Sequence, residues 1–199
     1  MTETESPRPV NRPTGPRDLK AAAGAVATLL EAFGFRAPVV QYPGIVDTPE
    51  RVARAYAELL DGYVQDPAKI LSKRFAEWHD ELIVVRNIPF SSLCEHHLLP
   101  FSGTVSVGYL PKGEVVGLSK IPRLVRCFSR RLQIQERLTS EIAHAIYEHL
   151  DARFAGCIVR SHHQCMSLRG VASAGDMVTS AMYGPFRDQL KSEFLRLAE

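Results

Sequence analysis

Two short segments rich in cysteine and histidine constrain the fold of this chain more than any other feature of its sequence. The first, Ser92–His97, has the sequence Ser-Leu-Cys-Glu-His-His, and the second, Ser161–Cys165, is Ser-His-His-Gln-Cys and begins 64 residues after His97. Both offer thiolate sulfur and imidazole nitrogen, the donors that zinc prefers. If the fold brings the segments together they form a metal site, and if it does not they are two polar loops.

The spacing within these segments indicates which side chains would bind a metal. Cys94 and His97 have the C-x2-H spacing at which two side chains of one turn reach the same ion, and Cys165 is the natural third ligand. Three protein ligands leave a position for water, as in catalytic zinc sites, where the pKa of that water falls toward about 7. His96 and His163 then remain as unliganded imidazoles suited to proton transfer. In the alternative, a structural zinc, one of these two histidines is the fourth ligand.

The composition is ordinary for a soluble globular protein, with 199 residues of which 45% are apolar and 23% charged. We expect a single domain over residues 18–199, preceded by a disordered, proline-rich tail over residues 1–17. The net charge of +2 gives no argument for nucleic acid or membrane as a partner, and the absence of any run of about 18 apolar residues argues against a membrane span. No signal-peptide pattern or dense cysteine framework is present, so we expect a cytoplasmic protein with reduced thiols.

Hydrophobic periodicity and capping residues predict a mixture of helices and strands, in which Asp18 and Thr48 cap the first two helices. Helices are predicted over Asp18–Phe33, Thr48–Leu60, Pro122–Arg131, Gln135–His149 and Phe186–Leu197, with a loop over Ala37–Val46. Strands are predicted over Leu82–Ile88, Thr104–Tyr109, Val115–Val116, Cys157–Arg160 and Val178–Met182. This order indicates an α+β fold with a largely antiparallel sheet. Cys127 and Cys157 fall in apolar patterns and are expected to be buried.

Several basic residues are candidates for binding an anion. Lys120 lies near a helix N-terminus with Arg123 one turn further on, and Arg169 follows the second cysteine and histidine segment. Arg51 and Arg54 share one face of the second helix. Each of these side chains could instead be a solvated surface charge. No Gly-rich Walker loop is present, so a nucleoside triphosphate would be held by side chains.

Glu136 opens the longest predicted helix and admits two interpretations. On the surface it would be an acid favoured by the helix dipole. Buried, it could accept hydrogen bonds from the amino group and ring N–H of a guanine. The sequence alone does not decide between them.

Taken together and in this order, five motifs resemble the GTP cyclohydrolase I family, from about residue 19 to the C-terminus. They are Thr48–Ala53, Ser92–Phe101, Gly117–Lys120, Arg131–Leu138, and His163–Met166 with Arg169-Gly170. The resemblance implies a T-fold, an antiparallel sheet with helices on one face, preceded by N-terminal helices. It also implies homodecamers made of two pentameric rings, in which strands join across subunits into a barrel and active sites lie at subunit interfaces.

The resemblance further implies roles for individual residues. Cys94, His97 and Cys165 would bind one zinc ion per subunit, and His96 and His163 would be catalytic. Glu136, with Gln135 beside it, would anchor the guanine. The triphosphate would be held by Ser119, Lys120, Arg123 and Arg169, with Arg51 and Arg54 added from a neighbouring subunit. The implied reaction converts GTP to 7,8-dihydroneopterin triphosphate and formate.

One departure from the family pattern is visible, because Ser173–Asp176 lacks a threonine-rich run, although no proposed ligand or catalytic position is lost. An alternative from another class is a binding or regulatory protein of the same fold that captures purines or pterins without turnover. A nitrile reductase or pterin synthase of this fold is a weaker alternative. The histidines beside the proposed metal ligands favour the hydrolase.

Overall fold

The computed structural model describes residues 12–35 and 43–199, which divide between Asp61 and Gly62 into two compact units. Each unit is described by itself. Most of the predicted disordered tail, residues 1–11, and most of the predicted loop over Ala37–Val46 lie outside the described residues. No helix in the described ranges combines the length and apolar character needed to cross a lipid bilayer.

The N-terminal unit consists of the predicted helix pair, α1 (Leu19–Ala32) and α2 (Thr48–Leu59), with a short 3-10 helix at Pro43–Ile45. Asp18 caps α1 as predicted, since its carboxylate accepts a hydrogen bond from the Ala21 N–H at 2.9 Å. The predicted cap by Thr48 is wrong.

Asp47 precedes α2 as its N-cap residue, and Thr48 is the first helical residue. The Asp47 carboxylate makes no capping bond and instead pairs with Arg51 at 2.8 Å, one turn along the helix. Pro49 therefore occupies the first turn, where the N–H that proline lacks has no intrahelical partner.

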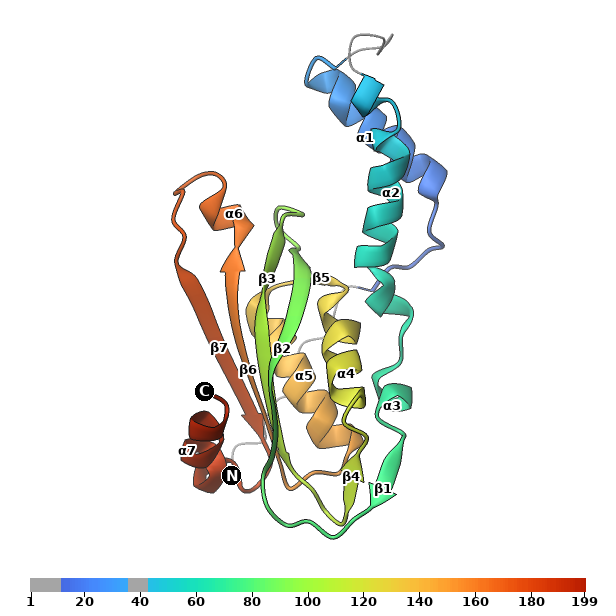
Figure 1. Ribbon diagram of the computed structural model, residues 1–199. Helices are drawn as coiled ribbons and strands as arrows, with labels where there is room; N and C mark the ends of the chain where they lie inside the picture. The colour runs from blue at the N-terminus through green and yellow to red at the C-terminus, as the bar shows by residue number, and fades with distance from the viewer. Residues whose placement is uncertain (1–11, 36–42) are drawn as a thin grey trace. The chain divides into compact units, whose positions relative to one another are not determined.

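The larger unit is built on a five-stranded sheet with the strand order β5-β2-β3-β6-β7 (Figure 1). Its strands are β2 (Ile83–Cys94), β3 (Pro100–Leu110), β5 (Leu132–Gln133), β6 (Phe154–His163) and β7 (Asp176–Tyr183). All neighbouring pairs are antiparallel except β2 and β5, which are parallel. A separate two-stranded sheet pairs β1 (Arg74–Ala76) with β4 (Glu114–Val116). The predicted α+β fold with a largely antiparallel sheet is confirmed.

The central strands are longer than the sequence predicts. β2 continues past Pro89, which has no N–H for a sheet hydrogen bond. At Pro89 the strand pairs only with β3 among the described residues, since β5 joins it only at Leu93 and Cys94. A proline is tolerated at such a locally open edge. A bulge between Val85 and Ile88, with Asn87 at a φ of 58°, adjusts the strand just before it.

Helices cover both faces of the sheet, which differs from the expected single face. The helices α4 (Lys120–Ser129) and α5 (Gln135–His149) pack on the face formed by residues such as Val105 and Val159. The C-terminal helix, α7 (Arg187–Leu197), packs on the opposite face around Phe194. The short helices α3 (Pro67–Ile70) and α6 (Gln164–Ser167) also belong to this unit, and η3 (Asp61–Val64) begins at the last residue of the N-terminal unit.

Helix α4 begins two residues before the predicted start at Pro122. Proline fits the third position of a helix because the N–H groups of the first turn have no intrahelical acceptor. The cysteines predicted to be buried, Cys127 and Cys157, are both fully buried.

The strand register places the two cysteine and histidine segments side by side. Ser92 on β2 pairs with Phe101 on β3, and Phe101 pairs in turn with His163 on β6. The ends of β2 and β6 therefore lie at one end of the sheet, separated only by the start of β3 (Figure 1).

The contact of α7 with the sheet requires two glycines. Gly108 and Gly156 are register partners on β3 and β6, and a Cβ atom on either would lie 2.6–2.7 Å from the ring of Phe194. We expect Gly156→Ala to destabilise this unit by about 1–3 kcal/mol, because the buried ring must move. Gly175→Ala, where the nearest atom lies 3.9 Å away, should stay within about 0.5 kcal/mol of the parent. Urea unfolding followed by circular dichroism measures both, and equal stabilities would contradict this packing.

Candidate metal centre

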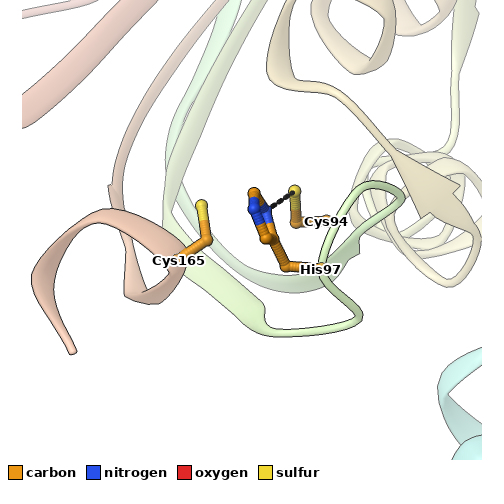
Figure 2. Close-up of side chains that lie close together, drawn as sticks. All are labelled: Cys94, His97 and Cys165. Atoms are coloured by element: carbon orange, nitrogen blue, oxygen red, sulfur yellow. Dashed lines mark hydrogen bonds between the residues drawn. The ribbon is translucent and has the colours of Figure 1, made fainter. Parts of the chain in front are cut away.

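Three side chains from the two segments meet at the end of the sheet. The candidate ligand atoms of Cys94, His97 and Cys165 all lie within 4.8 Å of one another. Figure 2 shows Cys94 and His97 together, with Cys165 facing them from α6. The Cys94 Sγ atom is 3.8 Å from His97 Nδ1. The prediction that the segments converge is confirmed.

A tight turn at the end of β2 presents two of these side chains. Cys94 is the last residue of the strand, and its carbonyl oxygen accepts from the Leu98 N–H while its own N–H donates to the Leu99 carbonyl, both at 2.9 Å. Leu98 has a φ of 55°, in the left-handed region that reverses the chain. The turn thus brings His97 back over the Cys94 thiol.

The donor set fits a zinc ion. Tetrahedral zinc with bonds of about 2.0–2.3 Å holds its ligand atoms roughly 3.5–3.8 Å apart. The observed distance of 3.8 Å between Cys94 Sγ and His97 Nδ1 agrees with this value. The ligand atoms of all three residues lie within 4.8 Å of one another, so Cys165 needs to move only slightly closer to bind the same ion. Two sulfurs and one nitrogen are a donor set that zinc favours over magnesium or calcium.

The protonation of Cys165 also fits a cation site. Burial, and next the nearby Cys94 thiol, raise the pKa of Cys165, whereas Arg169 lowers it. The Cys165 thiol therefore resists ionisation unless a cation lies beside it, and metal coordination supplies that charge.

His96 lies beside the metal group without belonging to it. Its Nδ1 atom is 3.9 Å from Cys94 Sγ, but the set of atoms that lie mutually within 4.8 Å contains His97 and not His96. The imidazole is exposed, and its Nε2 atom lies 3.9 Å from the carboxylate of Glu95. Glu95 in turn pairs with Arg137 of α5 at 2.5 Å. This pair joins the turn that carries His96 to the helix behind it.

Sequence reasoning missed this ion pair. Glu95 stands inside the cysteine and histidine motif and Arg137 directly follows Glu136, so proximity to predicted site residues was the available signal. That signal marks each residue singly and does not indicate that these two residues, 42 positions apart, pair with each other.

His163 stands on β6 at the level of the metal group. Its ring stacks on Phe101 with centroids 4.6 Å apart and an angle of 4° between the planes. Its Nε2 atom lies 2.9 Å from Gln135 Oε1. Burial lowers the pKa of His163, and Glu136 raises it by a smaller amount, so the imidazole is neutral near pH 7.

The two residues expected at the guanine lie in different environments. Glu136 is exposed, on the surface near His163. Gln135 is only 1% exposed, and its side chain bonds to β6 and β7. The structure thus gives Gln135 protein partners in the interior of the unit.

The predicted anion-binding residues fall into three places. Arg169 is exposed and close enough to Cys165 to affect its pKa. Ser119, Lys120 and Arg123 lie at the start of α4, which follows β4 at the other end of the sheet (Figure 1). Arg51 and Arg54 are exposed on α2, in the N-terminal unit.

The sheet separates the start of α4 from the metal group. The Val116 N–H at the end of β4 donates to the Tyr109 hydroxyl, and Tyr109 pairs with Ile83 at the start of β2. Cys94 ends that strand, so roughly 35 Å of extended chain lies between the two ends. Lys120 and Cys94 of one chain therefore do not form a single site.

The fold and the site define a mixed α+β protein with a candidate metal centre of two thiols and one imidazole. A sequence profile of the family described as GTP cyclohydrolase I matches residues 22–199. The chain belongs to this family, which is one of hydrolases.

Three relatives named GTP cyclohydrolase 1 support this assignment. The protein of Nitrosospira multiformis is 55% identical over 162 residues, covering 78% of this chain and 84% of the relative. That of Rhodopirellula baltica is 47% identical over 183 residues, covering 92% and 79%. That of Corynebacterium glutamicum is 45% identical over 178 residues, covering 88% and 89%.

Replacing one candidate ligand tests the metal centre. We expect Cys165→Ser to reduce bound zinc from about one ion per chain to a small fraction of that, because one thiolate of the set is lost. The far-ultraviolet circular dichroism should stay unchanged, since Cys165 lies at the rim of a large core. Cys127→Ala, at a buried cysteine on α4, is the matched control and should keep its zinc. Elemental analysis of the purified proteins measures the difference, and equal zinc contents would contradict the site.

Proposed function

We propose that this chain converts GTP to 7,8-dihydroneopterin triphosphate with release of formate, the first step in making tetrahydrofolate and related pterins. Membership of the GTP cyclohydrolase I family, by the match over residues 22–199, is the observation that carries the proposal. The grouping of Cys94, His97 and Cys165 supports it, because opening a purine ring by hydrolysis requires an activated water.

One zinc ion per subunit is proposed at this group, held by Cys94, His97 and Cys165. When bound there it supplies a Lewis acid that makes water acidic near neutral pH. The reducing cytoplasm, which is the proposed location, keeps both cysteines available as thiols.

The two remaining histidines are proposed to move protons. His96 donates a proton to N7 of the purine as water adds to C8, and the five-membered ring opens to a formamide. Hydrolysis of that formamide releases formate. His163, which is neutral near pH 7, accepts a proton from the ribose as the sugar opens and rearranges. The sugar carbon chain then closes on the freed amine with loss of water, so one water is consumed overall.

Substrate binding is proposed to use Glu136 and Arg169 near the metal group together with basic residues supplied by other subunits. Glu136 accepts hydrogen bonds from the amino group and ring N–H of guanine, and its exposure leaves it accessible. The residues proposed to hold the triphosphate are Ser119, Lys120, Arg123 and Arg169, with Arg51 and Arg54 as further contacts. The triphosphate leaves intact, so these side chains bind and do not cleave it.

Active sites are proposed to form between subunits of a ring-shaped homodecamer with a T-fold barrel. The roughly 35 Å of strand between the two ends of β2 exceeds the length of one GTP molecule, so Lys120 and Cys94 must come from different copies to bind the same substrate. A head-to-tail ring places one end of each chain beside the other end of its neighbour. Strand pairing across subunits also covers open sheet edges.

Turnover with GTP tests the activity. The zinc-loaded protein should release formate and form a pterin that fluoresces after oxidation, in equal amounts. Absence of both products at full zinc occupancy would refute the proposed reaction.

His96→Ser should lower kcat by about 100-fold or more while GTP still binds, because the proton donor is lost and the contacts to substrate are kept. Unchanged kcat would refute the role of His96.

Complementation between two inactive variants tests the shared site. Lys120→Ala and Cys165→Ser alter opposite ends of the sheet, and each variant alone should form inactive assemblies. Co-expressed, they should recover up to about a quarter of parental activity, because random mixing leaves that fraction of interfaces with two intact halves. No recovery in verified mixed oligomers would contradict a site shared between subunits.

A further inference from the structure

Gln135 is the centre of a buried hydrogen-bond network that reaches His163. It is the first residue of α5, and its side chain is only 1% exposed. Its Nε2 atom lies 3.1 Å from the Val159 carbonyl oxygen, 3.0 Å from the Met177 carbonyl oxygen and 3.2 Å from Thr179 Oγ1. Its Oε1 atom lies 2.5 Å from Ser161 Oγ and 2.9 Å from His163 Nε2.

The orientation of this amide is fixed by its partners. Backbone carbonyl oxygens only accept hydrogen bonds, so the NH2 group of Gln135 must face Val159 and Met177. Rotating the amide by half a turn would place its oxygen against both carbonyl oxygens in the interior, with the loss of two hydrogen bonds and added repulsion. The Oε1 atom of Gln135 therefore faces His163.

An acceptor at this position determines the proton on His163. Because Gln135 Oε1 cannot donate, His163 Nε2 must carry the hydrogen, and in the neutral ring Nδ1 is then the acceptor. Stacking on Phe101 holds the ring plane. Within residues 12–35 and 43–199, no protein group hydrogen-bonds His163 Nδ1, which leaves that atom for the substrate.

We propose that Gln135 is a positioning residue that fixes the tautomer of His163 and makes Nδ1 the atom that accepts a proton from the substrate. This proposal rests on the proposed function for its consequence, but the tautomer itself does not. The proposal gives two adjacent residues different roles. Gln135 points into the interior and orients the imidazole, whereas Glu136, about 100° further round the helix, is on the surface and available to guanine.

Neutron diffraction from perdeuterated crystals of the zinc-loaded protein, grown near pH 8 without GTP, tests the tautomer directly. We expect deuterium on His163 Nε2 and none on Nδ1. Deuterium on Nδ1 with a bare Nε2 would overturn the proposal. Because no turnover is measured, this result stands whether or not the protein acts on GTP.

Steady-state kinetics of Gln135→Met test the positioning role. Methionine keeps the volume and removes the acceptor, so the His163 ring loses the contact that fixes both its tautomer and its position in the stacking plane. Free choice of tautomer alone would lower kcat only a few-fold, whereas a displacement of the reacting atom by about 1 Å costs about 100-fold, so kcat should fall by about 10- to 100-fold with KM for GTP nearly unchanged. A direct contact between Gln135 and guanine would instead raise KM with kcat preserved, and that outcome would overturn the proposal while leaving the proposed reaction intact.

Thr139→Val is the matched control for stability. Thr139 is buried in the same network, one turn along α5, where its hydroxyl bonds to the Gln135 carbonyl oxygen at 2.7 Å and lies 2.6 Å from Thr179 Oγ1. It should lose a comparable amount of stability by urea unfolding but keep kcat within about twofold. If both variants lose kcat in proportion to stability, the role of Gln135 is structural only. Should Gln135→Met fail to fold, the neutron result still decides the tautomer.

Discussion

The register of β3 between β2 and β6 is the constraint on which the rest of the larger unit depends. It sets Ser92, Phe101 and His163 at one level of the sheet. A slip of one residue would turn every side chain of the moving strand to the opposite face. The metal group, the stacking of Phe101 on His163, and the burial of Phe194 over its two glycines all require the observed pairing, so core packing and site geometry are specified together.

The sequence predicts the elements of this fold well where periodicity is regular. The helix predicted from about Gln135 to His149 is confirmed over Gln135–His149, and the convergence of the two cysteine and histidine segments is confirmed. Predictions fail where a residue usually found at element ends lies within one. Because of Pro89, the predicted strand ends at Ile88, whereas β2 continues to Cys94. Because of Pro122, the predicted helix begins at Pro122, two residues after the observed start of α4. In both cases tertiary pairing or first-turn geometry removes the cost of the missing N–H.

The site illustrates a second limit of sequence reasoning. Residue types and spacing suffice to propose Cys94, His97 and Cys165, because few side chains bind zinc. The partners that orient the histidines are ordinary residues with many roles. Neither the ion pair that links Glu95 to α5 nor the burial of Gln135 has a sequence signature, since each depends on contacts between segments far apart in the sequence. Such supporting residues are identified from the hydrogen-bond partners of each buried polar group in the three-dimensional structure.

The length of the sheet has a consequence for how much activity a given amount of protein delivers. With the basic start of α4 and the cysteine group at opposite ends of β2, a dissociated chain carries two half-sites and no whole one under the proposed assembly. Output then depends on the concentration of chains more steeply than in direct proportion, because assembly precedes catalysis. A modest loss of folded protein would therefore reduce pterin supply disproportionately, and one defective copy would impair the sites on both of its sides.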